Sequence, residues 1–152
     1  MRIQEAIFFM TNSTDLLQSI YQNAQMGVRT LEHMLSFTED GPLKKHMEAQ
    51  LRGYLSLQTE AEHLLRDAGQ NPLGLNALEK ARTSVMVSLE SLTDKSPSHL
   101  AEMLLIGSNM GVIDALKNLR KFEGEADKNL CTLMRKALVF EENNAERLKK
   151  FI

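Results

Sequence analysis

Apolar residues recur every three or four positions along most of this chain, which is the spacing of one face of an α-helix. The chain has only three prolines and 5% aromatic residues, so it lacks the frequent turn signals and aromatic residues of a strand-rich protein. The pattern predicts four long helices of roughly 25 residues each and a shorter helical connection of roughly 20. The predicted fold class is therefore all-α.

Capping residues and helix breakers indicate where each helix should begin and end. Ser13 is a capping residue with an acidic residue in the following turn, so the first helix should begin near it. Ser96-Pro97 should open the third long helix, because proline is favoured at the first helical position. The expected helices cover residues 13–34, 43–68, 75–92, 97–124 and 125–152.

The lengths of the links predict how these helices are arranged. Short links make an antiparallel hairpin of the first two long helices and another of the last two. A long helical crossover between the two hairpins is the topology of a ferritin-like four-helix bundle. A chain of 152 residues is long enough for one core and too short for two ordinary domains. We therefore predict a single ferritin-like bundle domain over residues 1–152, with an apolar N-terminal segment at 1–11.

A short internal repeat is consistent with two related hairpins. Met26-Gly27-Val28 recurs as Met110-Gly111-Val112, and 61–64 resembles 145–148 at the same spacing along the chain. Glycine inside a helix costs roughly 1 kcal/mol relative to alanine, so these glycines indicate close helix approach. We expect Gly27, Gly107 and Gly111 on inner faces.

Composition narrows the environment and the partners. Lysine and arginine are scattered and the net charge is only -2, which predicts no nucleic-acid partner. The apolar runs are far shorter than the ~20 residues of a membrane-spanning helix, which predicts no membrane insertion. The single Cys131 and an N-terminus unlike a secretory signal predict a cytoplasmic location.

Three segments carry a resemblance to a known family. They are Ser98-His99-Leu100-Ala101-Glu102-Met103, Gly107-Ser108-Asn109-Met110-Gly111 and Phe140-Glu141-Glu142-Asn143-Asn144. From about Leu17 onward the chain resembles a family of small uncharacterised bacterial proteins with a ferritin-like four-helix bundle. The resemblance implies a fold and no activity, because no catalytic motif lies in the matching segments.

The segment Glu60-Ala61-Glu62-His63 contains the Glu-x-x-His motif of di-iron bundles. On a helical projection Glu60 lies about 135° and His63 about 165° from the centre of the apolar face. A di-iron site requires these ligands on the inner face. We therefore expect both side chains to point to solvent, and we expect no histidine on an inner face.

Glu141 differs, because it lies within about 10° of the apolar centre of the fourth helix. A buried carboxylate must be hydrogen-bonded, neutralised or metal-bound. In one interpretation Glu141, Glu62 and Asp114 share a metal ion. In the other, which we favour, Glu141 belongs to a polar layer that fixes the register of the bundle. The amides that could complete this layer are Gln58, Asn118 and Asn144.

The third long helix carries apolar residues on a second face, outside its main seam. They are Met103, Ile106, Met110, Ile113 and Leu116. The crossover should cover part of this face with a stripe of Leu78, Val85 and Leu89. The remaining apolar surface, together with Ile3, Ile7, Phe8 and Phe9, predicts a homodimer.

These patterns leave three functional hypotheses. The leading one is a non-enzymatic ferritin-like bundle that acts by self-association or by binding a protein partner. The main alternative is a metal-binding ferritin relative with an incomplete or unconventional carboxylate site, and the third is a carrier of a small apolar ligand. Nine methionines could line a small apolar pocket for such a ligand, but methionine more often fills gaps in a core. The sequence predicts no catalytic residue and no cofactor, because no nucleophile has a base beside it.

Overall fold

A computed structural model of the chain describes residues 3–73, 88–122 and 127–152, with side chains from Ser13 onward and not at 122. Its elements are α1 (Ile3–Leu35), α2 (Pro42–Asp67), α4 (Pro97–Phe122), α5 (Lys128–Leu148) and the 3₁₀ turn η2 (Lys149–Phe151). All regular structure in these ranges is helical, which confirms the all-α prediction.

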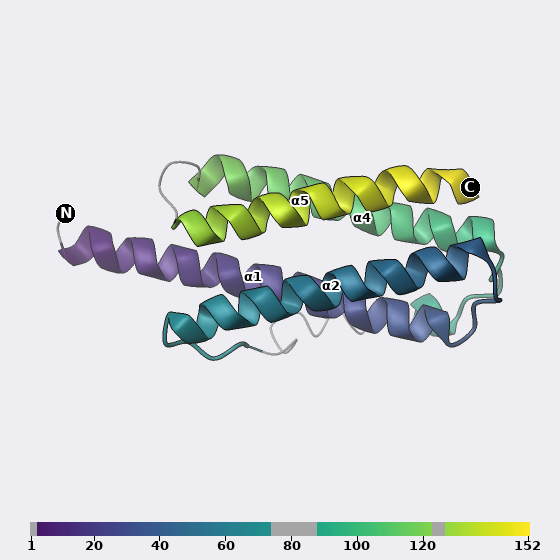
Figure 1. Ribbon diagram of the computed structural model, residues 1–152, viewed down its shortest axis with the longest axis horizontal. Coiled ribbons are helices and arrows are strands. Elements are labelled where there is room, and N and C mark those ends of the chain that lie inside the picture. Colours follow the sequence, from purple (N-terminus) through teal and green to yellow (C-terminus); the bar gives the residue numbers. More distant parts are fainter. Residues whose placement is uncertain (1–2, 74–87, 123–126) are drawn as a thin grey trace.

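Figure 1 shows the long helices lying side by side as antiparallel pairs, α1 with α2 and α4 with α5. The two pairs pack on each other mainly through α2 and α5, while no comparable packing joins the described parts of α1 and α4. The bundle is therefore closed on the side of α2 and α5 and looser on the side of α1 and α4.

The ends of α2 follow from local sequence signals, as expected. Pro42 occupies the start of the helix, directly after Gly41. At the other end Gly69 has a φ of 75°, a conformation that glycine adopts without strain. Its N–H donates to the carbonyl of Arg66 at 2.9 Å, and the N–H of Gln70 donates to that of Leu65 at 2.8 Å. These paired bonds form a Schellman motif, which satisfies the last carbonyls of the helix.

The starts of α4 and α5 are capped by side chains. The Ser96 hydroxyl accepts a hydrogen bond from the N–H of His99 at 3.4 Å, and Pro97 begins the helix. The Asp127 carboxylate accepts one from the N–H of Asn129 at 3.3 Å. The expected start of the third long helix is thus confirmed, whereas its expected end at Gly124 lies outside the described residues.

The start of α1 corrects the sequence-based boundary. The helix begins at Ile3 and not near Ser13, so the polar residues around Ser13 lie inside it. Serine, threonine and asparagine cap a helix only where the preceding chain leaves the helical conformation. No glycine or proline precedes Ser13, and nothing in that segment stops the helix. Figure 1 shows that the first turns of α1 project beyond the ends of the other helices.

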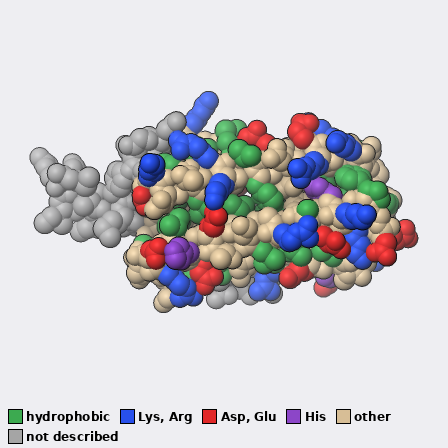
Figure 2. Space-filling view, viewed as in Figure 1, with side chains coloured by type: hydrophobic (Ala, Val, Ile, Leu, Met, Phe, Trp, Pro, Cys, Tyr) green, Lys and Arg blue, Asp and Glu red, His purple; other side chains and the backbone are tan. Residues whose placement is uncertain are grey.

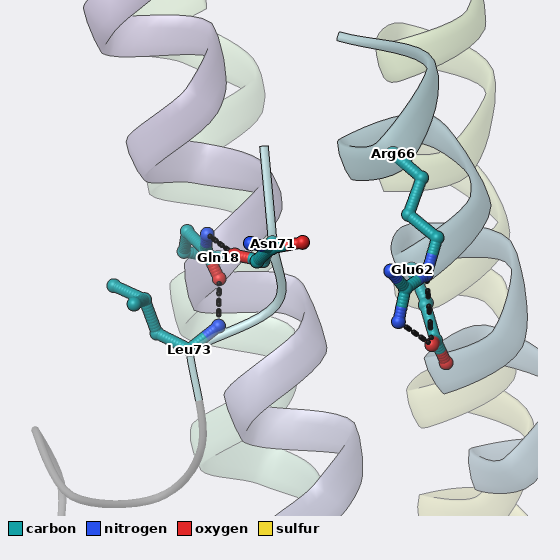
Figure 3. A network of polar contacts seen from close by, with 5 residues as sticks. All are labelled: Gln18, Glu62, Arg66, Asn71 and Leu73. Carbon is teal, nitrogen blue, oxygen red and sulfur yellow. Dashed lines mark hydrogen bonds and ion pairs between the residues drawn. The ribbon is translucent and has the colours of Figure 1, made fainter. Parts of the chain in front are cut away.

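The link after α2 is held against α1 by one buried glutamine (Figure 3). The Gln18 amide nitrogen donates to the Asn71 carbonyl at 2.9 Å, and its oxygen accepts from the Leu73 N–H at 2.9 Å. The chain that leaves α2 is therefore held alongside α1 as far as Leu73. Of the predicted covering stripe, Leu89 is buried, whereas Leu78 and Val85 lie outside the described residues.

Two apolar clusters fill the two ends of the bundle. One is built from α1, α2 and α5 around Leu65, Leu133 and Met134. The other joins all the long helices around Met34, Met47 and Leu148. On the surface, Figure 2 shows basic and acidic side chains interspersed over the face in view. None of the helices in the described ranges is long and apolar enough to cross a membrane.

Candidate functional site

A layer of polar side chains separates the two apolar clusters. Gln50 and Tyr54 come from α2, Ser108 from α4, and Glu141 and Asn144 from α5. Gln50 is 2% exposed, Ser108 1%, Asn144 3% and Glu141 7%, whereas Tyr54 is partly buried by surface area. A long hydrogen bond of 3.5 Å from the Gln50 amide to the Ser108 hydroxyl joins the two hairpins.

Glu141 carries the unusual electrostatics of this layer. Burial raises its pKa from 4.5 to about 7, although nearby hydroxyls of Tyr54 and Ser108 hydrogen-bond to the carboxyl group and oppose the shift. Burial, and then the negative charge of Glu141, raise the pKa of Tyr54 well above 10. Tyr54 therefore remains a neutral phenol, while Glu141 is divided between its acid and carboxylate forms near neutral pH.

The hydrogen bonding of the layer is incomplete. Within the described residues, Glu141 Oε2, Gln50 Oε1 and Asn144 Nδ2 are buried and have no hydrogen-bond partner. Each such atom costs about 1–3 kcal/mol relative to a satisfied one. Buried polar atoms without a protein partner are normally hydrogen-bonded to an ordered water, an ion or a ligand, so these three atoms mark where such a group would bind.

Two glycines make room for the two titratable side chains. A Cβ at Gly27 would lie 2.8 Å from the Tyr54 ring, and one at Gly111 would lie 2.8 Å from Glu141 Cδ. In each hairpin, then, the first helix supplies a glycine against which a side chain of the second helix packs. The inner-face prediction is right for these two and wrong for Gly107, because a Cβ there would have no neighbour within 4 Å.

A cavity of about 400 Å³ lies between α1 and α4, where the helices pack less closely. Gln50, Tyr54 and Glu141 line it from α2 and α5. Its remaining walls are mostly apolar and include Met26, Leu31, Met34, Leu89, Met103, Leu104, Ile106 and Met110. Pockets that bind small molecules have volumes of about 300–1,000 Å³ and combine apolar walls with a few polar groups. This cavity has both properties.

The three carboxylates considered as metal ligands do not come together. Glu141 and Asp114 line the same cavity. Glu62 instead lies on the surface of α2, where it accepts a hydrogen bond from Arg66 at 2.8 Å (Figure 3). Across the described ranges, no group of three or more His, Cys, Asp or Glu side chains is placed to hold a metal ion.

The Glu-x-x-His motif of α2 points outward, as the projection predicted. Glu60 pairs with Lys136 of α5 at 2.9 Å, and His63 lies 3.4 Å from Asp67 with a 76% exposed side chain. These contacts are surface ion pairs, which contribute little to stability.

His46 corrects the expectation that no histidine lies on an inner face. It is only 9% exposed, and its ring packs 6.1 Å from that of Phe151 in η2. Burial, with a smaller effect from Arg147, lowers the pKa of His46 below 6.5, against a hydrogen bond to Gln50. A helical projection places His46 at the edge of the outer face of its helix. In the structure Phe151 of η2 packs against this edge and buries it.

The polar layer was predicted only in part. Asn144 belongs to it, whereas Gln58 and Asn118 are half-buried. Gln50 and Ser108 were missed, although each lies three or four residues after an apolar core position, Met47 and Leu104. Helical spacing therefore contained the signal for both residues.

Comparison with known proteins adds no relative: no family model, curated protein or solved structure matches this chain. The resemblance to small bacterial ferritin-like proteins stays a prediction from the sequence segments that carry it.

Proposed function

We propose that this chain is a non-enzymatic binding protein that holds a small, largely apolar ligand in the cavity between α1 and α4. The observation that carries this proposal is the cavity of about 400 Å³ beside the buried polar layer. The space opens to solvent at Ile106 and Met110, whose side chains are 56% and 61% exposed, and it reaches inward to the buried Gln50 and Glu141. A small molecule could therefore enter from solvent and contact the polar layer.

The character of the lining supports the same function. Methionine has an unbranched, polarizable side chain that adapts to the shape of a bound molecule. Met26 and Met34 on α1 face the cavity together with Met103 and Met110 on α4. A buried group with a shifted pKa, such as Glu141, is typical of a functional site when it lies in a pocket.

The proposal is tested with 1-octanol as an uncharged apolar probe, by isothermal titration calorimetry. We expect saturable binding of one molecule per chain. Gly107→Phe should abolish this binding, because Gly107 lines the cavity and the phenyl ring would occupy it. The substitution should be tolerated, since a Cβ at this position has no atom within 4 Å. Asn109→Phe, at an exposed position of α4 outside the lining, is the matched control. Absence of saturable binding to the unmodified protein would refute the function.

The architecture that carries this cavity is, in our proposal, ferritin-like. Two antiparallel helix pairs and a long connection between α2 and α4 support this interpretation. The single Cys131 supports the further proposal of a cytoplasmic location.

A second candidate function is self-association, favoured by the outer face of α4. Its exposed apolar side chains are Ile113 (51%) and Leu116 (46%), together with Ile106 (56%) and Met110 (61%), which also line the cavity. Contiguous apolar surface of this kind is uncommon on monomers, and two-fold dimers are the usual way to bury it. We propose a homodimer through this face, extended by the projecting N-terminal turns of α1 (Figure 1).

Light scattering at tens of micromolar tests the dimer. Ile113→Asp with Leu116→Asp should give a monomer, and neither residue lines the cavity. Leu55→Asp on α2, which is 43% exposed, is the control and should leave the dimer intact. Deletion of residues 1–11 should weaken the dimer if that segment crosses to the partner. A monomeric unmodified protein would refute this candidate.

A further inference from the structure

We infer that the ligand of this cavity is a cation, a protonated amine on an apolar body, with its ammonium group bound between Glu141 and Gln50. This inference rests on the proposed function, because it assigns a chemical class to the ligand of the same cavity.

The charges of the lining give the first argument. Asp114 and Glu141 both line the cavity, and no lysine, arginine or histidine does so among the described lining residues. Among the described lining residues, an anionic ligand would meet two carboxylates and no opposite charge. A cation would gain a favourable interaction with each carboxylate, and most with the buried one, because water screens it least.

The unsatisfied atoms give the second and independent argument. Within the described part of the chain, two atoms of the lining residues are buried without a partner, Glu141 Oε2 and Gln50 Oε1, and both are hydrogen-bond acceptors. An ammonium group has three N–H donors and no acceptor, so it matches this pair. An alcohol offers one donor and would leave one of the two acceptors unsatisfied.

The position of Glu141 gives the third argument. Its carboxyl group packs against the backbone at Gly111, where a Cβ would lie 2.8 Å from Cδ. The group is thereby held at the wall that α4 contributes to the cavity, with 7% of the residue exposed. The pKa of about 7 supports this role, since the carboxylate form is accessible at neutral pH when a cation is present to stabilise it.

The surrounding groups do not offer a competing partner for the carboxylate. On α2 the titratable neighbour is Tyr54, a neutral donor, and on α4 it is Asp114, which carries the same charge. The described lining from α1 has no ionisable side chain. His46 lies one turn before Gln50 on α2, and burial lowers its pKa, which keeps it neutral at pH 8.

The experiment compares three probes of equal length by isothermal titration calorimetry at pH 8: octylamine, 1-octanol and octanoate. Charge-assisted hydrogen bonds are roughly twice as strong as neutral ones, so we expect octylamine to bind at least about tenfold more tightly than 1-octanol. Octanoate should bind most weakly. Glu141→Gln should remove the advantage of octylamine over 1-octanol, because the charge-assisted hydrogen bond is lost.

Two further variants keep the test decisive. Glu142→Gln changes an exposed neighbour on α5 and should leave all three affinities unchanged. Gly111→Ala, which displaces the Glu141 carboxyl group, should weaken octylamine more than 1-octanol. If the unmodified protein binds octylamine and 1-octanol equally, or Glu141→Gln keeps the preference for octylamine, the cation assignment is wrong and the proposed function stands. If neither probe binds, the proposed function itself fails.

Discussion

The two ends of this bundle and its middle are buried to a similar extent but are built from different side chains. At the ends, Leu65 and Leu148 are fully buried among other apolar residues. In the middle, Glu141 and Gln50 are almost as buried, yet each has an acceptor without a donor. Natural proteins depart from complete packing and hydrogen bonding mainly at functional sites. The contrast suggests that the two apolar ends stabilise the fold and that the polar middle binds the ligand.

The largest expected effect is on an apolar end. Leu65→Ala should lower the free energy of unfolding by about 3 kcal/mol, because it removes a buried side chain and leaves a cavity. Leu55→Ala on the exposed face of the same helix should lower it by less than about 0.5 kcal/mol. Urea unfolding followed by circular dichroism measures both. Equal effects would mean that the ends do not carry the stability.

In the middle of the bundle, replacing the buried Glu141 should raise the free energy of unfolding and not lower it. The pKa of Glu141 is about 7 when folded and has an ordinary value of 4.5, so the folded state binds more protons between these values. Its contribution to stability is therefore full below pH 4.5 and is lost as the pH rises through 7. Glu141→Gln should raise the free energy of unfolding by about 2 kcal/mol at pH 8 and change it little at pH 4.5.

Urea unfolding at both pH values measures this difference, and Glu142→Gln is the control at an exposed site. The lowered pKa of His46 makes its own contribution fall as the pH drops below 6.5, but it is present in both proteins and cancels. A variant that loses stability at pH 8 and regains it with a divalent metal would favour the metal-binding hypothesis instead.

Alanine substitutions at two glycines on different hairpins should change the free energy of unfolding in opposite directions, because only one of the glycines lies in a close helix contact. Gly53→Ala should destabilise by about 1–3 kcal/mol, because its Cβ would overlap the Phe140 ring. Gly107→Ala should stabilise by up to about 1 kcal/mol, since its Cβ meets nothing and alanine favours the helix. Thermal unfolding measures both. A destabilising Gly107→Ala would show that the cavity is narrower than the structure indicates.

The smallest expected effect is at the outward Glu-x-x-His motif. Replacement of both Glu60 and His63 by alanine should change the free energy of unfolding by less than about 0.5 kcal/mol, because only surface ion pairs are lost. The same urea titration measures it. Loss of a bound metal in this variant would show that the motif is a binding site.

Several features could be predicted from sequence because their causes are local. The Schellman motif at Gly69 and the cap at Ser96 each involve residues only a few positions apart. The inward position of Glu141 follows from the helical period alone, and so does the outward position of His63. Local geometry therefore allowed the helices and the phase of each face to be inferred.

Other features depended on residues distant in sequence and could not be inferred in this way. His46 is buried because Phe151 of η2 returns to cover it. The distance between α1 and α4 depends on how α2 and α5 pack, which includes the Phe140 ring against Gly53. A periodic pattern gives the direction of a side chain but not the distance to the facing helix.

The sequence by itself determined an all-helical chain with a carboxylate turned toward the core of α5. The tertiary structure alone decided that this carboxylate borders a cavity and that no described residue donates to its Oε2. The physical reason is that helix formation and helix phase are set by hydrogen bonds and side chains within a few residues. A cavity, in contrast, is the space left when whole helices pack, so it depends on side chains from every helix around it.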